Sequence, residues 1–140
     1  MSFVVDASVA LKWFVPEVQS RAAEELLHVQ AELHAPDLLV VEIANAAWKK
    51  VLRREIDRRQ AMSIAFVIHR GGPRLYPSEI FIERAAELAM TLNHSVYDCL
   101  YLACAENLGA TLVTADARLL KMVADTELAR MVRPLSAWQA

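Results

Sequence analysis

The sequence predicts an α/β protein in which a mostly parallel central sheet of about four to five strands is flanked by helices. Short apolar runs at positions 3–5 and 111–114 alternate with longer stretches of helical pattern, which is typical of parallel sheets. The 140 residues are the length of one domain with a sizeable core, and 56% of them are hydrophobic, as in globular proteins. Because only three glycines and five prolines are present, little chain is left for linkers, and residues 1–140 are expected to form one domain.

The first half of the chain is predicted to be mainly helical after its first strand. Residues 3–5 form that strand, and a short helix follows over residues 7–14. Pro16 and Glu17 favour the start of a second helix, since proline fits the first helical position and an acidic side chain fits the helix dipole. That helix is expected to run to about residue 33, with buried positions at Val18, Ala22, Leu26 and Val29. An extended link at Ala35-Pro36 and helices over residues 37–52 and 57–69 come next.

Glycine, proline and serine residues mark the element boundaries in the second half of the chain. Gly71-Gly72-Pro73 is the strongest break and ends the preceding helix. Ser78 is expected to cap a helix that runs to Leu92, and Gly109 is expected to end a helix over residues 97–108. The remaining predicted elements are short strands at residues 75–76, 111–114 and 132–133 and a helix over residues 116–123.

Composition limits the classes of function that fit this chain. The net charge of −2 argues against a protein that holds nucleic acid through a broad basic surface, although an enzyme can still approach phosphates through a bound cation. No apolar run approaches the roughly 18 residues of a membrane span, and the first residues lack the pattern of a secretory signal. Cys99 and Cys104 are expected to be buried free thiols in a reducing compartment. We therefore expect a cytoplasmic protein without membrane contact.

Two acidic residues follow two strands of the same design. FVVDASVALK and TLVTADARLL each contain a short apolar strand, then Asp6 or Asp116, then the start of a helix. In open parallel sheets, residues beyond the carboxyl ends of the strands face the crevice in which ligands bind. If the two strands are neighbours, Asp6 and Asp116 face each other across that crevice.

Two further acidic residues, Asp98 and Glu42, are surrounded by apolar positions in YDCLYLACAE and PDLLVVEIANAAW. Taken singly, each aspartate fits a helix N-cap, and Glu42 fits a helix surface at a rim. Taken together, four converging carboxylates repel one another by about 4 kcal/mol for each pair 4 Å apart at an effective dielectric constant near 20. They need a cation. Since the chain has neither a cysteine pair nor a histidine cluster suited to zinc, an all-oxygen site favours Mg²⁺ or Mn²⁺ and phosphoryl chemistry.

Four stretches together carry a resemblance to a known family. In their order and spacing, VVDASVALKWFVPE, PDLLVVEIANA, YDCLYLACAE and TLVTADARLL resemble the PIN-domain family, and most closely the single-domain toxins of VapBC-type toxin–antitoxin pairs. The resemblance implies a PIN-like fold, metal-dependent endoribonuclease activity on RNA, and a cognate antitoxin protein as partner. It places the catalytic and metal-binding acids at Asp6, Glu42, Asp98 and Asp116. Supporting polar side chains fall on Ser8, Thr114 and, with a weaker match, Asn45.

Other candidate residues have a plain structural interpretation beside a functional one. The basic residues between positions 49 and 59 form either a solvated helix face or a path for RNA phosphates, with Lys49 and Arg53 as candidate contacts. Arg118, close to Asp116, is a third candidate. An apolar surface shared between helices makes a homodimer plausible. The four histidines have no common spacing and are expected at the surface or at a rim: His28, His34, His69 and His94.

Two alternatives to a ribonuclease stay open at this point. One is another Mg²⁺-dependent nuclease or phosphohydrolase; against a phosphatase that forms an aspartyl-phosphate, the second residue after Asp6 is Ser8 and not a second aspartate. The other is a non-catalytic PIN-like interaction module. The mark of such a module would be a lost acidic residue, and all four are present.

Overall fold

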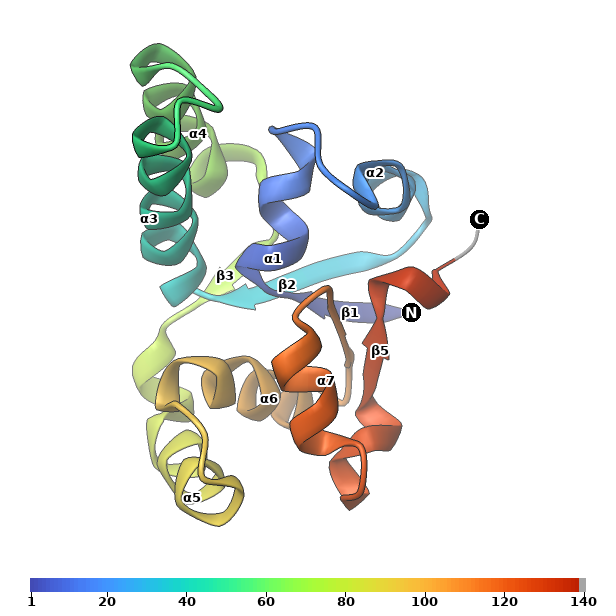
Figure 1. Ribbon diagram of the computed structural model, residues 1–140. Helices are drawn as coiled ribbons and strands as arrows, with labels where there is room; N and C mark the ends of the chain where they lie inside the picture. The colour runs from blue at the N-terminus through green and yellow to red at the C-terminus, as the bar shows by residue number, and fades with distance from the viewer. Residues whose placement is uncertain (139–140) are drawn as a thin grey trace.

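The protein is built on one five-stranded sheet. The computed structural model describes residues 1–138, and all neighbouring strands pair in parallel in the order β3-β2-β1-β4-β5 (Figure 1). The predicted α/β class with a parallel sheet and flanking helices is thereby confirmed. The strands are β1 (Ser2–Val5), β2 (Glu32–Pro36), β3 (Arg74–Tyr76), β4 (Thr111–Thr114) and β5 (Val132–Pro134).

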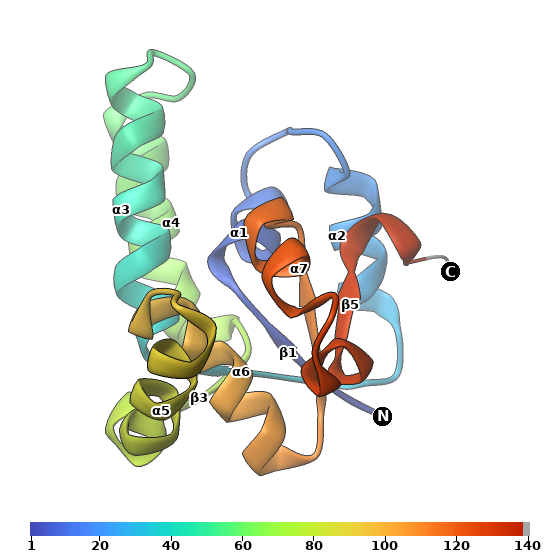
Figure 2. The ribbon, with the colours of Figure 1, turned by 60° about the horizontal axis from the view of Figure 1, so that its bottom comes forward.

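Helices cover both faces of this sheet. Helices α3 and α4 lie side by side and extend together beyond the sheet, as both ribbon views show (Figures 1 and 2). Within residues 1–138, no helix is both long and apolar enough to span a bilayer. The helices are α1 (Ala7–Ala10), α2 (Ser20–His28), α3 (Leu38–Leu52), α4 (Arg58–Gly71), α5 (Ile82–Leu92), α6 (Val96–Leu108) and α7 (Ala117–Val123). Short 3₁₀ turns cover Leu11–Trp13, Ser78–Phe81, Glu127–Met131 and Leu135–Ala137.

Strand β1 lies at the centre of the sheet and contributes to both cores. Its side chains alternate between the faces: Val4 packs into the larger cluster with α3, α4 and α6, while Phe3 and Val5 pack into a smaller cluster with α2. All three side chains are buried. A strand that is covered on both faces needs a continuous apolar run, and this explains why residues 3–5 contain no polar position.

The strand order reverses direction beside β1, which makes this place the topological switch point of the sheet. From β1 the chain crosses through α1 and α2 to β2 on one side, and β4 pairs with the other side of β1 much later in the sequence. The predicted neighbourhood of the strands before Asp6 and Asp116 is therefore confirmed, with Val5 opposite Val113. In such sheets the crevice opens at this point, beyond the carboxyl ends of the two strands.

The predicted helix over residues 16–33 is wrong at both ends. Helix α2 covers only Ser20–His28, and Val18, predicted to be buried, is 82% exposed. The supposed link at Ala35-Pro36 belongs to β2, an interior strand that pairs with both β1 and β3. Residues 30–33 favour a helix by intrinsic propensity, and the pairing of Glu32 and Leu33 with β1 outweighs that preference.

Ser78 caps a different helix from the one predicted. Its Oγ accepts a hydrogen bond from the backbone N–H of Leu38 at 3.0 Å, so it satisfies the first turn of α3. In return, Oδ1 of Asp37 accepts hydrogen bonds from the N–H and the hydroxyl of Ser78. Helix α5 begins only at Ile82, after a 3₁₀ turn. The exchange fixes the start of α3, which carries Glu42.

Two expectations about single side chains have different outcomes. Cys99 and Cys104 are buried free thiols, as predicted, and burial raises their pKa values to about 11 and about 12. The expectation that His34 lies at the surface is wrong. Its ring is buried, and Nδ1 lies 2.8 Å from the hydroxyl of Tyr76 on the neighbouring strand β3.

Gly71 and Gly72 at the end of α4 give a matched test of how closely the chain approaches itself at this point. A β-carbon on Gly72 would lie 2.6 Å from the backbone oxygen of Ile68, whereas one on Gly71 would meet nothing within 4 Å. We expect Gly72→Ala to lower the free energy of unfolding by about 1–3 kcal/mol through overpacking, and Gly71→Ala to change it by less than about 0.5 kcal/mol. Urea denaturation of the purified variants measures both. Equal effects of the two substitutions would contradict the close approach at Gly72.

Candidate active site

Asp6 ends β1 as a buried carboxylate with three hydrogen bonds. It serves as the N-cap of α1, where Oδ1 accepts from the N–H of Val9 at 3.2 Å. The hydroxyl of Ser8 donates to the same oxygen at 2.5 Å, and the hydroxyl of Thr114 donates to Oδ2. Burial, with a smaller contribution from the charge of Asp116, raises the pKa of Asp6 from 3.8 to about 6 in spite of these donors.

The two hydroxyls tie the ends of β1 and β4 together. Ser8 Oγ accepts from the N–H of Ala115 at 3.0 Å, so it bridges the residue after β4 and the carboxylate of Asp6. Thr114 Oγ1 accepts from the N–H of Asp116 at 3.0 Å while donating to Asp6. Both hydroxyls therefore donate to Asp6, and the hydrogen bond between Thr114 and Asp116 uses the backbone N–H of Asp116.

Glu42 approaches from α3, one turn into the helix. Its carboxylate oxygen Oε1 accepts a hydrogen bond of 2.5 Å from the hydroxyl of Tyr101 on α6. Burial raises the pKa of Glu42, and the charges of Asp98 and Asp116 raise it further, while the Tyr101 hydrogen bond acts in the opposite direction. Burial and the charge of Glu42 also raise the pKa of Tyr101, so its phenol stays a hydrogen-bond donor.

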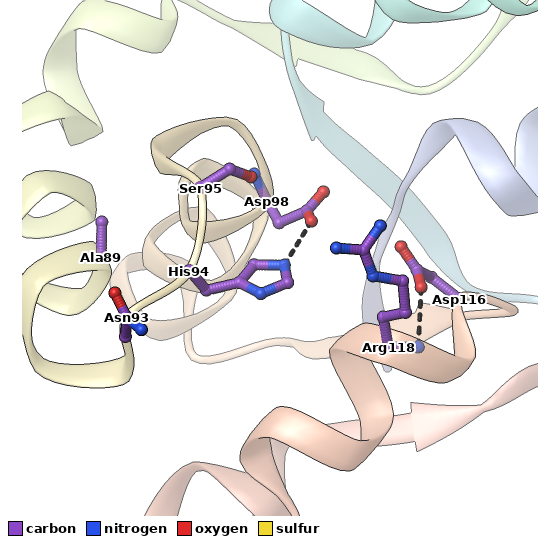
Figure 3. A pocket seen from close by; sticks show the side chains of 7 residues that line it. All are labelled: Ala89, Asn93, His94, Ser95, Asp98, Asp116 and Arg118. Carbon is purple, nitrogen blue, oxygen red and sulfur yellow. Dashed lines mark hydrogen bonds and ion pairs between the residues drawn. The ribbon is translucent and has the colours of Figure 1, made fainter.

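Asp98 lies in the first turn of α6, where the helix dipole favours a negative charge. Ser95 is the N-cap of this helix, and its Oγ accepts from the N–H of Asp98 at 3.3 Å. His94, one turn earlier, places Nε2 2.6 Å from Oδ2 of Asp98 (Figure 3). His94 was expected only at a surface or rim; it lines the cavity beside Asp98, where its ring orients that carboxylate.

Asp116 begins α7 and faces the same cavity as Asp98. Its Oδ1 accepts from the backbone N–H groups of Arg118 and Leu119, which is the N-cap arrangement. The cavity has a volume of about 400 Å³ and is lined by Asp98, Asp116, His94 and Arg118 among others. Figure 3 shows the Arg118 guanidinium lying between the side chains of Asp98 and Asp116.

The four acidic residues come from four elements and interact through their charges. Asp116 raises the pKa of Asp6, and Asp98 and Asp116 both raise that of Glu42. In the described part of the chain, none of the four carboxylates forms an ion pair with lysine or arginine. The site therefore concentrates negative charge, and Arg118, which lies in the cavity, forms no ion pair with these carboxylates.

This set of donors fits a hard divalent cation. All four side chains offer oxygen ligands, which Mg²⁺ and Mn²⁺ prefer. Within residues 1–138, no three acidic, histidine or cysteine side chains lie close enough together to form a complete metal-binding group. Mg²⁺ does not require such a group, because it keeps several waters and is bound directly through one or two carboxylates.

The other sequence candidates lie on α3 or at its end, outside this acidic cluster. Asn45, Lys49 and Arg53 are all exposed. Lys50, from the same basic stretch, forms ion pairs with Glu17 at 2.6 Å and Glu55 at 2.7 Å, as expected for a helix surface. Glu42 accepts a hydrogen bond from Tyr101, a residue that was not predicted from the sequence. The sequence pattern that could have indicated it is the spacing of Asp98 and Tyr101, which lie three residues apart and so share one face of α6.

The pKa of Asp6 predicts a pH-dependent stability difference between wild type and Asp6→Asn in EDTA. Because the folded state holds this pKa above its ordinary 3.8, ionised Asp6 destabilises the fold above about pH 6, and the cost vanishes below pH 3.8. Asn keeps an acceptor for Ser8 and carries no charge. We expect the stability advantage of Asp6→Asn to grow by on the order of 3 kcal/mol between pH 4 and pH 7.

Urea denaturation at several pH values measures this difference. Asp125→Asn is the matched control, because Asp125 is exposed. Its difference from wild type should stay constant over the same pH range. A pH-independent difference for Asp6→Asn would contradict the burial of an ionisable group at this position.

Comparison with known proteins assigns the chain to a family. The PIN domain model matches residues 3–125. Ribonuclease VapC3 of Pyrobaculum aerophilum is 32% identical over 121 residues, which cover 85% of this chain and 92% of the relative. The structure of VapC20 of Mycobacterium tuberculosis, a sarcin–ricin loop-cleaving toxin, superposes with a TM-score of 0.67 at 16% identity, covering 84% of this chain and 92% of that one. A toxin–antitoxin complex from Klebsiella pneumoniae gives a TM-score of 0.61 at 18% identity over 94% and 96% of the two chains. The chain belongs to the PIN-domain family.

Proposed function

We propose that this protein is a metal-dependent endoribonuclease that hydrolyses RNA phosphodiester bonds as the toxin of a toxin–antitoxin pair. The observation that carries the proposal is the acidic cluster at the switch point of the sheet, where burial and the charges of neighbouring carboxylates raise the pKa values of Asp6 and Glu42. The similarity to ribonuclease VapC3 over most of both chains supports the choice of RNA as substrate. The cavity between Asp98 and Asp116 is the proposed place for the scissile phosphate.

Four side chains would hold Mg²⁺ or Mn²⁺ in this proposal, some of them directly and the others through water bound to the ion: Asp6, Glu42, Asp98 and Asp116. When bound, the ion supplies a polarised phosphate and a water of lowered pKa. Ser8 and Thr114 occupy an oxygen each of Asp6 and hold its carboxylate still at the end of β1. Asn45, three residues after Glu42 on α3, is proposed as a further polar support near that acid.

Three cations are proposed to contact RNA phosphates. Arg118 lines the cavity itself and lies between two of the acidic side chains (Figure 3). Lys49 on α3 and Arg53, the residue that caps this helix, follow Glu42 by seven and eleven residues, close to whole numbers of helical turns, so they lie on the same side of the helix as Glu42. They lie roughly 10 Å and 16 Å along the helix from Glu42, within reach of neighbouring nucleotides.

The proposed partners are a cognate antitoxin protein and a second copy of the chain. A groove of about 380 Å³ between α3 and α4 is lined mainly by apolar side chains, and Trp48 in it is 54% exposed. Such a surface suits an amphipathic helix of a partner protein. The toxin–antitoxin complex among the structural neighbours supports the antitoxin. The buried free thiols fit the proposed cytoplasmic location.

Cleavage of a mixed RNA substrate by the purified chain tests the activity. We expect cutting with Mg²⁺ or Mn²⁺, none with EDTA, and a loss of at least 100-fold in Asp98→Asn, because that variant removes a metal-binding charge and leaves the helix intact. Asp125→Asn, at an exposed position, should cut like wild type.

Two results would count against the ribonuclease. Full activity in Asp98→Asn would show that the acidic site is misassigned or that a contaminating nuclease is present. Cutting of DNA or of phosphomonoesters in place of RNA would favour another Mg²⁺-dependent nuclease or phosphohydrolase.

Expression in a bacterial host tests the toxin role. Wild type expressed alone should slow growth, and Asp98→Asn at the same soluble level should not, since the proposed harm comes from RNA cleavage. Growth curves and the amount of soluble protein are measured together. Normal growth with abundant soluble, active wild-type protein would contradict the toxin role.

A further inference from the structure

One buried tyrosine contacts the acidic site without being one of its acids. Tyr101 lies in the middle of α6 and is 1% exposed. Its hydroxyl donates a hydrogen bond of 2.5 Å to Oε1 of Glu42, a residue 59 positions away on α3. This contact joins the two helices that carry Glu42 and Asp98.

The position of Tyr101 allows its hydroxyl little freedom. The ring is packed in the larger hydrophobic cluster among neighbours from the sheet and from other helices. It lies three residues after Asp98, and residues at this spacing share one face of a helix. The same face of α6 therefore presents one acid directly and holds a second acid through a hydrogen bond.

The contact also determines which carboxylate oxygen of Glu42 is free to bind a cation. A glutamate side chain has three rotatable bonds, and a half-buried one would otherwise turn toward water. With Oε1 occupied by the Tyr101 hydroxyl, Oε2 is the oxygen left free of that donor. The arrangement resembles Asp6, where the hydroxyl of Ser8 and that of Thr114 also restrict the carboxylate.

We propose that Tyr101 is a positioning residue, which holds the Glu42 carboxylate in the orientation that binds the divalent cation. The inference rests on the proposed function, because it assigns Glu42 to a metal site. In this proposal the Tyr101 hydroxyl increases the affinity for the metal ion although the phenol itself does not contact the ion. Groups that orient metal-binding side chains typically change affinity by 10- to 100-fold.

Mn²⁺ titration of the metal-free full-length chain, followed by calorimetry, tests the role of Tyr101. Tyr101→Phe keeps the ring and removes only the hydroxyl, so we expect Mn²⁺ to bind about 10-fold more weakly or worse. Tyr97→Phe is the matched control, since Tyr97 is on the same helix and 62% exposed; it should bind like wild type. Near-ultraviolet circular dichroism of each variant verifies that the fold is retained.

A double-mutant cycle with Glu42→Gln separates positioning from a general effect on structure. If Tyr101 acts through Glu42, Tyr101→Phe should weaken Mn²⁺ binding in the wild-type background and have no further effect in the Glu42→Gln background. Equal losses in both backgrounds, or unchanged binding by Tyr101→Phe, would overturn the inference alone. Failure of wild type to bind Mn²⁺ would contradict the proposed function and, with it, the inference.

Discussion

The burial of Asp6 at the end of β1 is the constraint on which the rest of the site depends. Strand β1 is covered on both faces, so the carboxylate of Asp6 at its end lies in a region with little water. Ionisation is costly there, and the pKa of Asp6 rises to about 6. Ser8 and Thr114 offset part of that cost and, in doing so, join the ends of β1 and β4. Asp116, two residues beyond β4, is thereby held near Asp6, and its negative charge adds to the repulsion that a divalent cation would relieve.

The acids of the site come from elements that the parallel sheet arranges around one point. Asp6 and Asp116 follow strands β1 and β4, while α3 and α6 bring Glu42 and Asp98 from the side. Because each acid is held by hydrogen bonds to groups outside the quartet, the site does not need attraction between the acids to stay assembled. The hydrogen bond of Tyr101 to Glu42 is the direct link between the two helices at this point.

Much of this arrangement could be predicted because it follows from local patterns. The apolar runs before Asp6 and Asp116, together with the switch-point rule, are enough to predict that their strands are neighbours. Strand β2 could not be found in this way, since its first residues, Glu32 and Leu33, are good helix formers whose extended form depends on pairing with β1. The contacts of Tyr101 and Ser78 were also beyond sequence reasoning. Each depends on how two elements tens of residues apart are placed against one another.

The central claim is that the four carboxylates hold a divalent cation. The most direct measurement is an anomalous difference map from crystals of the full chain soaked in Mn²⁺. Crystals treated with EDTA, and therefore free of Ca²⁺ and other divalent cations, are the reference. The account predicts a strong peak beyond the carboxyl ends of β1 and β4, with carboxylate oxygens of the acidic cluster as ligands at about 2.1–2.2 Å, near the Mg²⁺ distance. A map with no peak there, or with Mn²⁺ bound only at other carboxylates, would contradict it.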